Sequence, residues 1–183
     1  MSTIHIAGIS GSLRRGSFNT ALLRAAHNVL PEDTKLEIVD YSDVPLFNAD
    51  VEAASGFPES VQQLRRQLAL ADAFLIATPE YNYSIPGVLK NAIDWASRGP
   101  DSPLNRKLAG IMGSGGRLGT AYAQGHLRQI LTHNDVRTLN KPMVMIARGP
   151  EHFDEELNLI DERYLDQIRR LLEALVSEVN AAA

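Results

Sequence analysis

The chain contains no cysteine among its 183 residues. Disulfides, thiolate nucleophiles and cysteine–zinc sites are therefore excluded together. Long apolar runs are also missing, since no stretch approaches the roughly 20 residues that a membrane-spanning helix requires. The chain runs directly into a strand-like segment at residue 4, without the basic region or cleavage motif of a secretory signal. This pattern favours a cytoplasmic location.

An excess of charge of one sign is missing as well. Lys and Arg number 18 against 22 Asp and Glu, which gives a net charge of −4. Nothing therefore indicates a nucleic-acid partner or an anionic membrane surface. The 5 histidines are scattered without metal-ligand spacing, so no metal site is expected. The length and the hydrophobic content of 44% fit a single domain over residues 1–183.

Short apolar runs alternate with helical patterns along the whole chain. We expect strands at residues 4–9, 36–39, 73–77, 108–112 and 143–147. We expect helices near residues 22–30, 61–71, 88–95, 120–133 and 154–179, with an irregular segment at 41–58. This alternation predicts an α/β fold, a three-layer doubly wound sandwich with a five-stranded parallel sheet. In a flavodoxin-like strand order, 2-1-3-4-5, the first, third and fourth strands are neighbours.

The loops after those three strands have unusual compositions, and they should meet at the carboxyl edge of the sheet. The first loop offers backbone amides at a helix N-terminus, two hydroxyls, an amide side chain and a cation. These features predict a phosphate site. The P-loop lysine is missing, so a phosphate monoester fits better than a triphosphate; a helix cap with a spare arginine is the alternative. The candidate residues are Ser12, Leu13, Arg14, Arg15, Gly16, Ser17, Phe18 and Asn19.

The loop after the third strand is stiffened by Pro79 and Pro86. Ser84 is expected to cap the following helix, with Pro86 in its first turn. Such a loop presents backbone groups at fixed positions to a flat, polar-edged ligand; an ordinary stiff connection is the alternative. The candidates are Pro79, Glu80, Tyr81 and Asn82. For Glu80, we expect a hydrogen bond that organises the loop rather than an acid role.

The loop after the fourth strand contains four glycines, at positions 113, 115, 116 and 119. Glycine lets the backbone approach a ligand closely, and the Ser114 hydroxyl can donate to an acceptor. The candidates are Ser114, Gly115 and Gly116, with simple turn flexibility as the alternative.

Two of these loops carry motifs that resemble the NADPH-dependent FMN reductase family, most closely its chromate and quinone reductases, which include azo-dye reducers. The motifs are Gly11-Ser12-Leu13-Arg14-x-x-Ser17-x-Asn19 and Pro79-Glu80-Tyr81-Asn82-x-Ser84-x-Pro86-Gly87-x-Leu89-Lys90-Asn91-Ala92-Ile93-Asp94-Trp95. The resemblance covers most of the chain up to about Pro142. It implies a flavodoxin-like fold that holds FMN without a covalent bond. Residues 12–19 would hold the phosphate and ribityl chain, residues 79–82 would line the isoalloxazine, and residues 114–116 would face its pyrimidine side.

The resemblance also implies a reaction and an assembly. NADPH or NADH would deliver a hydride to the flavin, and a quinone, chromate, an azo compound or free flavin would then be reduced in the same cleft. No side chain is assigned a catalytic role. Relatives form homodimers or homotetramers with the flavin in a subunit cleft, toward which residues 45–50 would reach. Relatives carry Arg and Tyr, associated with tetramer contacts, where this chain has Tyr122 and Gly125, so the dimer is favoured.

Two other classes of protein compete with the reductase. A flavodoxin-type electron carrier would have no substrate of its own. Such carriers usually have a Ser/Thr-rich phosphate loop and strong acidity, whereas this loop contains Arg14 and Arg15 and the net charge is only −4. A nucleotide-phosphate hydrolase would need a lysine and a magnesium-binding carboxylate that the sequence does not offer.

Overall fold

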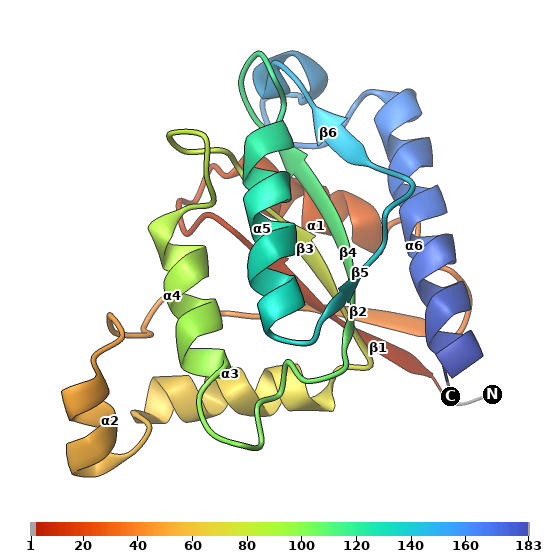
Figure 1. Ribbon diagram of the computed structural model, residues 1–183. Helices are drawn as coiled ribbons and strands as arrows, with labels where there is room; N and C mark the ends of the chain where they lie inside the picture. Colours follow the sequence, from red (N-terminus) through yellow and green to blue (C-terminus); the bar gives the residue numbers. More distant parts are fainter. Residues whose placement is uncertain (1–2, 183) are drawn as a thin grey trace.

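The computed structural model describes residues 3–182, which form a parallel sheet flanked by helices (Figure 1). The strands are β1 (Ile4–Ser10), β2 (Thr34–Ile38), β3 (Ala73–Ala77), β4 (Leu108–Ser114), β5 (Arg137–Thr138) and β6 (Val144–Ile146). The helices are α1 (Phe18–His27), α2 (Ala49–Ser55), α3 (Glu59–Leu70), α4 (Gly87–Ala96), α5 (Ala121–His133), α6 (Glu162–Ala182) and the 3₁₀ helix η1 (Gly149–His152). A single domain over residues 1–183 remains a proposal, and its first two and last residues lie outside the described part.

The sheet has the order β2-β1-β3-β4-β5, which confirms the predicted α/β fold and strand order. The fifth position is divided between two short strands. β5 pairs with the start of β4, where Arg137 lies opposite Leu108, and β6 pairs with its end, where Val144 lies opposite Met112. The strand predicted at 143–147 corresponds to β6. The interruption contains Pro142, which has no amide to donate to a sheet ladder.

Helices cover both faces of the sheet (Figure 1), and a hydrophobic core lies between each helical layer and the sheet. Leu22 of α1 and Leu171 of α6 belong to one core. Leu64 of α3, Leu89 of α4 and Leu127 of α5 belong to the other. β3 is buried on both faces, because its successive side chains alternate between the two cores. This three-layer burial explains why β1, β3 and β4 read as continuous apolar runs.

Two sequence predictions about the connections are wrong. The last helix begins at Glu162 rather than at residue 154, because Asp154 accepts a hydrogen bond from the backbone amide of Asn158 at 2.7 Å and closes a turn instead. Leu157 has φ 65°, which a helix cannot contain. Residues 41–58 are not wholly irregular, since they contain α2, which is capped by Asn48. No residue of α2 is buried, and Figure 1 shows this helix standing away from the sheet.

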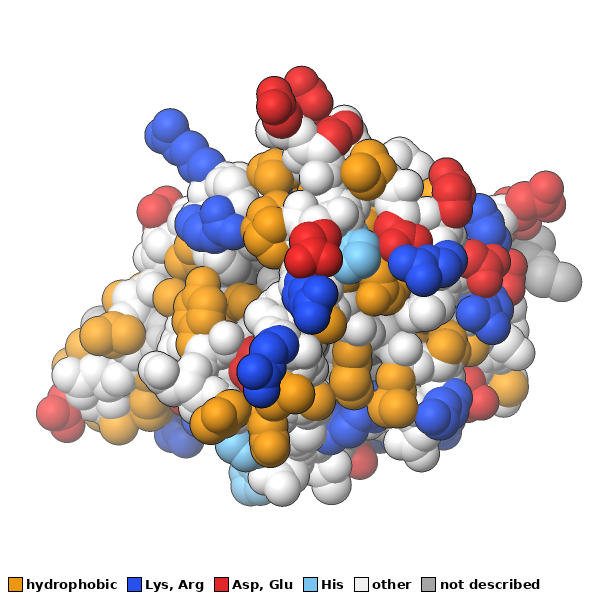
Figure 2. All heavy atoms as spheres, turned by 90° about the horizontal axis from the view of Figure 1, so that it is seen from above, with side chains coloured by type: hydrophobic (Ala, Val, Ile, Leu, Met, Phe, Trp, Pro, Cys, Tyr) orange, Lys and Arg blue, Asp and Glu red, His pale blue; other side chains and the backbone are white. Residues whose placement is uncertain are grey.

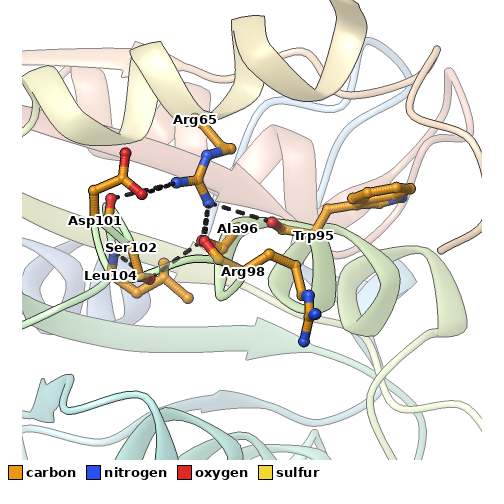
Figure 3. A network of polar contacts seen from close by, with 7 residues as sticks. All are labelled: Arg65, Trp95, Ala96, Arg98, Asp101, Ser102 and Leu104. Atoms are coloured by element: carbon orange, nitrogen blue, oxygen red, sulfur yellow. Dashed lines mark hydrogen bonds and ion pairs between the residues drawn. The ribbon is translucent and has the colours of Figure 1, made fainter. Parts of the chain in front are cut away.

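A buried arginine anchors the C-terminal end of α4 (Figure 3). Arg65 is 8% exposed, and its Nη1 donates to the carbonyl oxygens of Ala96 at 2.8 Å and Arg98 at 2.7 Å. Its guanidinium lies 4.4 Å from the centre of the Phe57 ring and forms an ion pair with the exposed Asp101 at 3.2 Å. A cation at this end satisfies carbonyls that the helix leaves unpaired and complements its dipole. Arg65 thereby fixes the end of α4 that lies away from the loop at residues 78–86.

The described residues show neither a membrane span nor a metal cluster. Within residues 3–182, no helix combines the length and the apolarity needed to cross a membrane. The same part of the chain contains no group of three His, Cys, Asp or Glu side chains able to hold a metal ion.

Candidate functional site

The loops that follow β1, β3 and β4 meet at the carboxyl edge of the sheet and enclose an open cleft of about 290 Å³. The lining residues are Ser12, Arg14, Ser17, Phe18, Asn19, Pro79, Glu80, Tyr81, Ser114, Gly115, Gly116 and Pro150. The volume lies just below the roughly 300–1,000 Å³ of small-molecule sites. Four predicted site residues do not line the cleft: Leu13, Arg15, Gly16 and Asn82. The structure therefore brings the three predicted loops together, and their backbone and a subset of their side chains border one space.

The first loop presents unpaired amides at the start of α1. Apart from the Ser17 amide, which closes a turn at residues 15–16, no backbone amide from 13 to 19 donates a hydrogen bond to the protein within the described residues. The Ser17 hydroxyl is 1% exposed and caps α1 by accepting from the Thr20 amide at 3.3 Å. Arg14 is exposed, with its guanidinium 5.4 Å from the centre of the Phe18 ring. An anion would therefore meet backbone amides, the helix dipole and Arg14, and the Ser17 hydroxyl, which accepts from Thr20, keeps its own proton to donate.

The Asn19 side chain joins two loops rather than pointing to a ligand. Its Nδ2 donates to the Ser114 carbonyl oxygen at 3.0 Å, and its Oδ1 accepts from the Ser114 amide at 2.9 Å. Asn19 is 3% exposed. The amide predicted as a ligand contact is thus occupied by the protein, and it fixes the first turn of α1 against the end of β4.

The loop after β3 contains a two-residue turn. The amide and carbonyl groups of Tyr81 and Ser84 exchange hydrogen bonds of 2.9 and 3.0 Å. Asn82 and Tyr83 have φ values of 52° and 62°, the left-handed conformations that such turns require. The predicted Ser84 cap is wrong: α4 begins at Gly87 after Pro86, and the Ser84 hydroxyl lies 3.0 Å from His126 Nδ1.

The Glu80 carboxylate organises this loop, as predicted. Its Oε2 accepts hydrogen bonds from the amides of Tyr122 at 2.8 Å and Ala123 at 3.0 Å, both in the first turn of α5.

The glycine-rich loop is packed too tightly for side chains at Gly113 and Gly115, whereas a Cβ at Gly116 would meet no atom within 4 Å. A Cβ at Gly113 would lie 2.3 Å from the Thr78 carbonyl oxygen and 2.4 Å from Thr120 Oγ1. The Ser114 hydroxyl is buried without a partner among the described residues. It faces Gly149, and a Cβ added at that position would lie 2.3 Å from the hydroxyl oxygen. This hydroxyl is enclosed, so the backbone forms the wall of the cleft.

The amides of this loop are directed to partners within the protein. The Ser114 amide donates to Asn19 and the Gly115 amide to the Ile146 carbonyl at 3.0 Å. Gly116 pairs with Gly119 in an isolated antiparallel bridge, in which the Gly119 amide donates to the Gly116 carbonyl at 3.1 Å. The loop is therefore held in place by its own backbone pairing.

Pro150 lines the cleft but was not among the predicted residues. Two backbone hydrogen bonds bring it there: the Arg148 amide donates to the Gly116 carbonyl at 2.9 Å, and the Gly149 amide donates to the Gly115 carbonyl at 3.0 Å. The sequence feature that points to Pro150 is the Gly149-Pro150 pair, which follows the last strand. The rule that selected the other loops, composition at the carboxyl end of a strand, could have selected this one as well.

Comparisons with known proteins show the family of this chain. The model of the family "NADPH-dependent FMN reductase" matches residues 4–151. An NAD(P)H-dependent FMN reductase of Pseudomonas aeruginosa is 52% identical over 173 residues, which cover 94% of this chain and 93% of that protein. A quinone reductase of Escherichia coli (strain K12) is 41% identical over 174 residues, 93% of each chain.

The solved structure of FerB, a flavoenzyme NAD(P)H:(acceptor) oxidoreductase from Paracoccus denitrificans, is similar to the whole chain. Its TM-score is 0.85 at 30% identity, with 97% of this chain and 98% of that chain covered. The match of the family model over residues 4–151 and the identities to curated reductases lead to one conclusion. This chain belongs to the NADPH-dependent FMN reductase family.

Proposed function

We propose that this protein oxidises NAD(P)H and, through non-covalently bound FMN, reduces quinones or similar small electrophiles. With a quinone, the balanced reaction is NADPH + H⁺ + quinone → NADP⁺ + hydroquinone. The observation that carries the proposal is the cleft itself, in which unpaired amides and Arg14 lie at one end and rigid loops form the walls. Chromate, azo compounds and free flavin would be further acceptors, because each can take up electrons from a reduced flavin.

The residues of the cleft fit FMN. The amides of residues 13–19 and the Arg14 guanidinium would bind the phosphate, because a dianion is stabilised at a helix N-terminus. Pro79, Glu80 and Tyr81 on one side and Gly115 and Gly116 on the other would border the ring. FMN, when bound there, supplies hydride acceptance and storage of two electrons.

The protein's own contribution is position and electrostatics. The glycine-rich loop, whose Gly115 and Gly116 line the cleft, would present its backbone to the pyrimidine side of the ring, where reduction places negative charge. The cleft is open to solvent, and the nicotinamide donor and the acceptor would approach the flavin from this open side in turn. No side chain is assigned as acid or base, and the proton of the reaction would come from solvent.

Steady-state kinetics test this proposal. FMN-loaded protein should oxidise NADPH in the presence of benzoquinone, with parallel double-reciprocal lines as expected when donor and acceptor use one site alternately. Arg14→Ala should weaken FMN binding, whereas Arg66→Ala, on the exposed face of α3, should not. Intersecting lines would contradict the alternating scheme. Bound FMN that NADPH cannot reduce would instead favour an electron carrier.

We further propose that two copies associate as a homodimer beside the cleft. Large side chains are exposed there: Tyr83 is 65% exposed, Tyr122 51% and Leu118 51%. Figure 2, which looks onto this end of the molecule, shows hydrophobic side chains between acidic and basic ones. Sedimentation velocity at micromolar concentration should give a dimer; a monomer would contradict the proposal, and a tetramer would indicate a second interface. Because NAD(P)H is an intracellular reductant, we place the reaction in the cytoplasm.

A further inference from the structure

We infer that Glu80 is a positioning residue, whose carboxylate locks the loop after β3 onto the N-terminus of α5 and so fixes one wall of the cleft. The inference rests on the proposed function, because that wall is the one assigned to the flavin ring.

The N-terminus of α5 lacks a cap of its own. Thr120 precedes the helix, but its side chain makes no capping hydrogen bond; its Oγ1 accepts from Gln124 Nε2 at 3.0 Å. The first-turn amides of a helix have no intrahelical acceptor, and the Ala123 amide lies in a fully buried residue. Glu80 Oε2 accepts from Tyr122 and Ala123 at 2.8 and 3.0 Å. A residue some 40 positions upstream therefore caps α5.

The Glu80 carboxylate is committed to this contact. Within residues 3–182, no ion pair involves it. A carboxylate is a suitable acceptor at a helix N-terminus, where the helix dipole stabilises negative charge. The other ties between the loop and α5 are exposed: the hydrogen bond between Ser84 and His126, and the ring contact between Tyr83 and Tyr122 with centroids 4.9 Å apart. Glu80 is half-buried and accepts two of the hydrogen bonds between the loop and α5, one of them exposed and one partly buried.

Loss of the Glu80 hydrogen bonds to α5 should displace only the wall of the cleft that is assigned to the flavin ring. Its chain neighbours Pro79 and Tyr81 line that wall and would move with it. The amides of residues 13–19 belong to a different loop, which Asn19 attaches to Ser114. FMN and riboflavin share the ring and differ in the phosphate. The loss of the anchor should therefore weaken the binding of both flavins by one common factor.

Two substitutions separate this role from general damage. Glu80→Ala removes both acceptor oxygens, and we expect about tenfold weaker binding of FMN and of riboflavin, the size of a typical lost helix cap. Glu80→Gln keeps a side-chain oxygen that can accept from the same amides, so it should restore most of the affinity. Arg14→Ala should lower only FMN binding and thus change the ratio of the two affinities.

The experiment is a fluorescence titration of the full-length apoprotein with FMN and with riboflavin. Glu59→Ala serves as the matched control, since Glu59 is an exposed carboxylate in the first turn of α3 that pairs with Arg66 at 2.7 Å. A common loss in Glu80→Ala and recovery in Glu80→Gln support the inference. Three results would overturn the inference on Glu80 and leave the proposed function standing. They are wild-type affinities in Glu80→Ala, a changed ratio of FMN to riboflavin affinity in that variant, and no recovery in Glu80→Gln. If the wild-type protein binds neither flavin, the proposed function falls and this inference falls with it.

Discussion

Replacing Asn19 with alanine should weaken the attachment between the phosphate loop and the end of β4. The Asn19 side chain makes two hydrogen bonds to the backbone of Ser114, at 3.0 and 2.9 Å, and the residue is 3% exposed. Asn19→Ala leaves the Ser114 amide and carbonyl without these partners. Each buried group left unpaired costs about 1–3 kcal/mol, and water entering from the adjacent cleft would recover part of this. We therefore expect a loss of about 2–4 kcal/mol in the free energy of unfolding.

Urea unfolding of the apoprotein, followed by far-UV circular dichroism, measures this loss directly. Asn105→Ala is the control, because Asn105 is exposed and its side chain makes no hydrogen bond within the described residues. Such a surface change should stay within about 0.5 kcal/mol. A loss below about 1 kcal/mol for Asn19→Ala, or one equal to that of the control, would refute the reasoning that this side chain braces two loops.

Two further perturbations test other parts of the fold. Arg65→Met should cost about 3–5 kcal/mol in urea unfolding, because the carbonyls at the end of α4 lose a buried charged donor; Asp101→Asn, at an exposed partner, should cost less than about 1 kcal/mol, and equal losses would contradict this assignment. Hydrogen bonds from Arg163, with a smaller contribution from His152, lower the pKa of Asp161 to about 2. The ionised Asp161 therefore stabilises the fold at pH values above the pKa that it has in the unfolded chain. This stabilisation is lost as the pH falls through the lower pKa that it has in the folded protein. The gap in urea midpoint between wild type and Asp161→Asn should close between pH 5 and about pH 2; a gap that is independent of pH would contradict the assignment.

The sheet and the position of the cleft could be predicted from local sequence. β1, β3 and β4 are apolar runs that end in small residues or proline, and parallel strands place their carboxyl ends at one edge. The unusual loops after these strands therefore had to converge. The split of the fifth strand was not predicted, because the short pairing of Arg137 with Leu108 depends on the neighbouring strand rather than on an apolar run of its own.

Side-chain roles were harder to predict, since they depend on contacts between distant parts of the chain. Asn19 has the chemistry of a ligand contact, but its partner Ser114 lies 95 residues away and uses both ends of the amide. The sequence suggests that the Ser114 hydroxyl could contact a ligand, but in the fold this hydroxyl is buried against Gly149. Asp154 has the chemistry of a helix start, but it closes a turn. Glu80 was predicted as a loop organiser, although its partners at the start of α5 became visible only in the fold.

The transfer of electrons from NAD(P)H through bound FMN to an acceptor is the central claim, and two anaerobic half-reactions test it most directly. NADPH is first added to the FMN-loaded protein, and benzoquinone follows once the reaction is complete. The account predicts that the visible absorbance of the flavin is lost on the first addition and returns on the second, with one NADPH consumed per flavin. Absorbance that persists while NADPH remains unconsumed would contradict it.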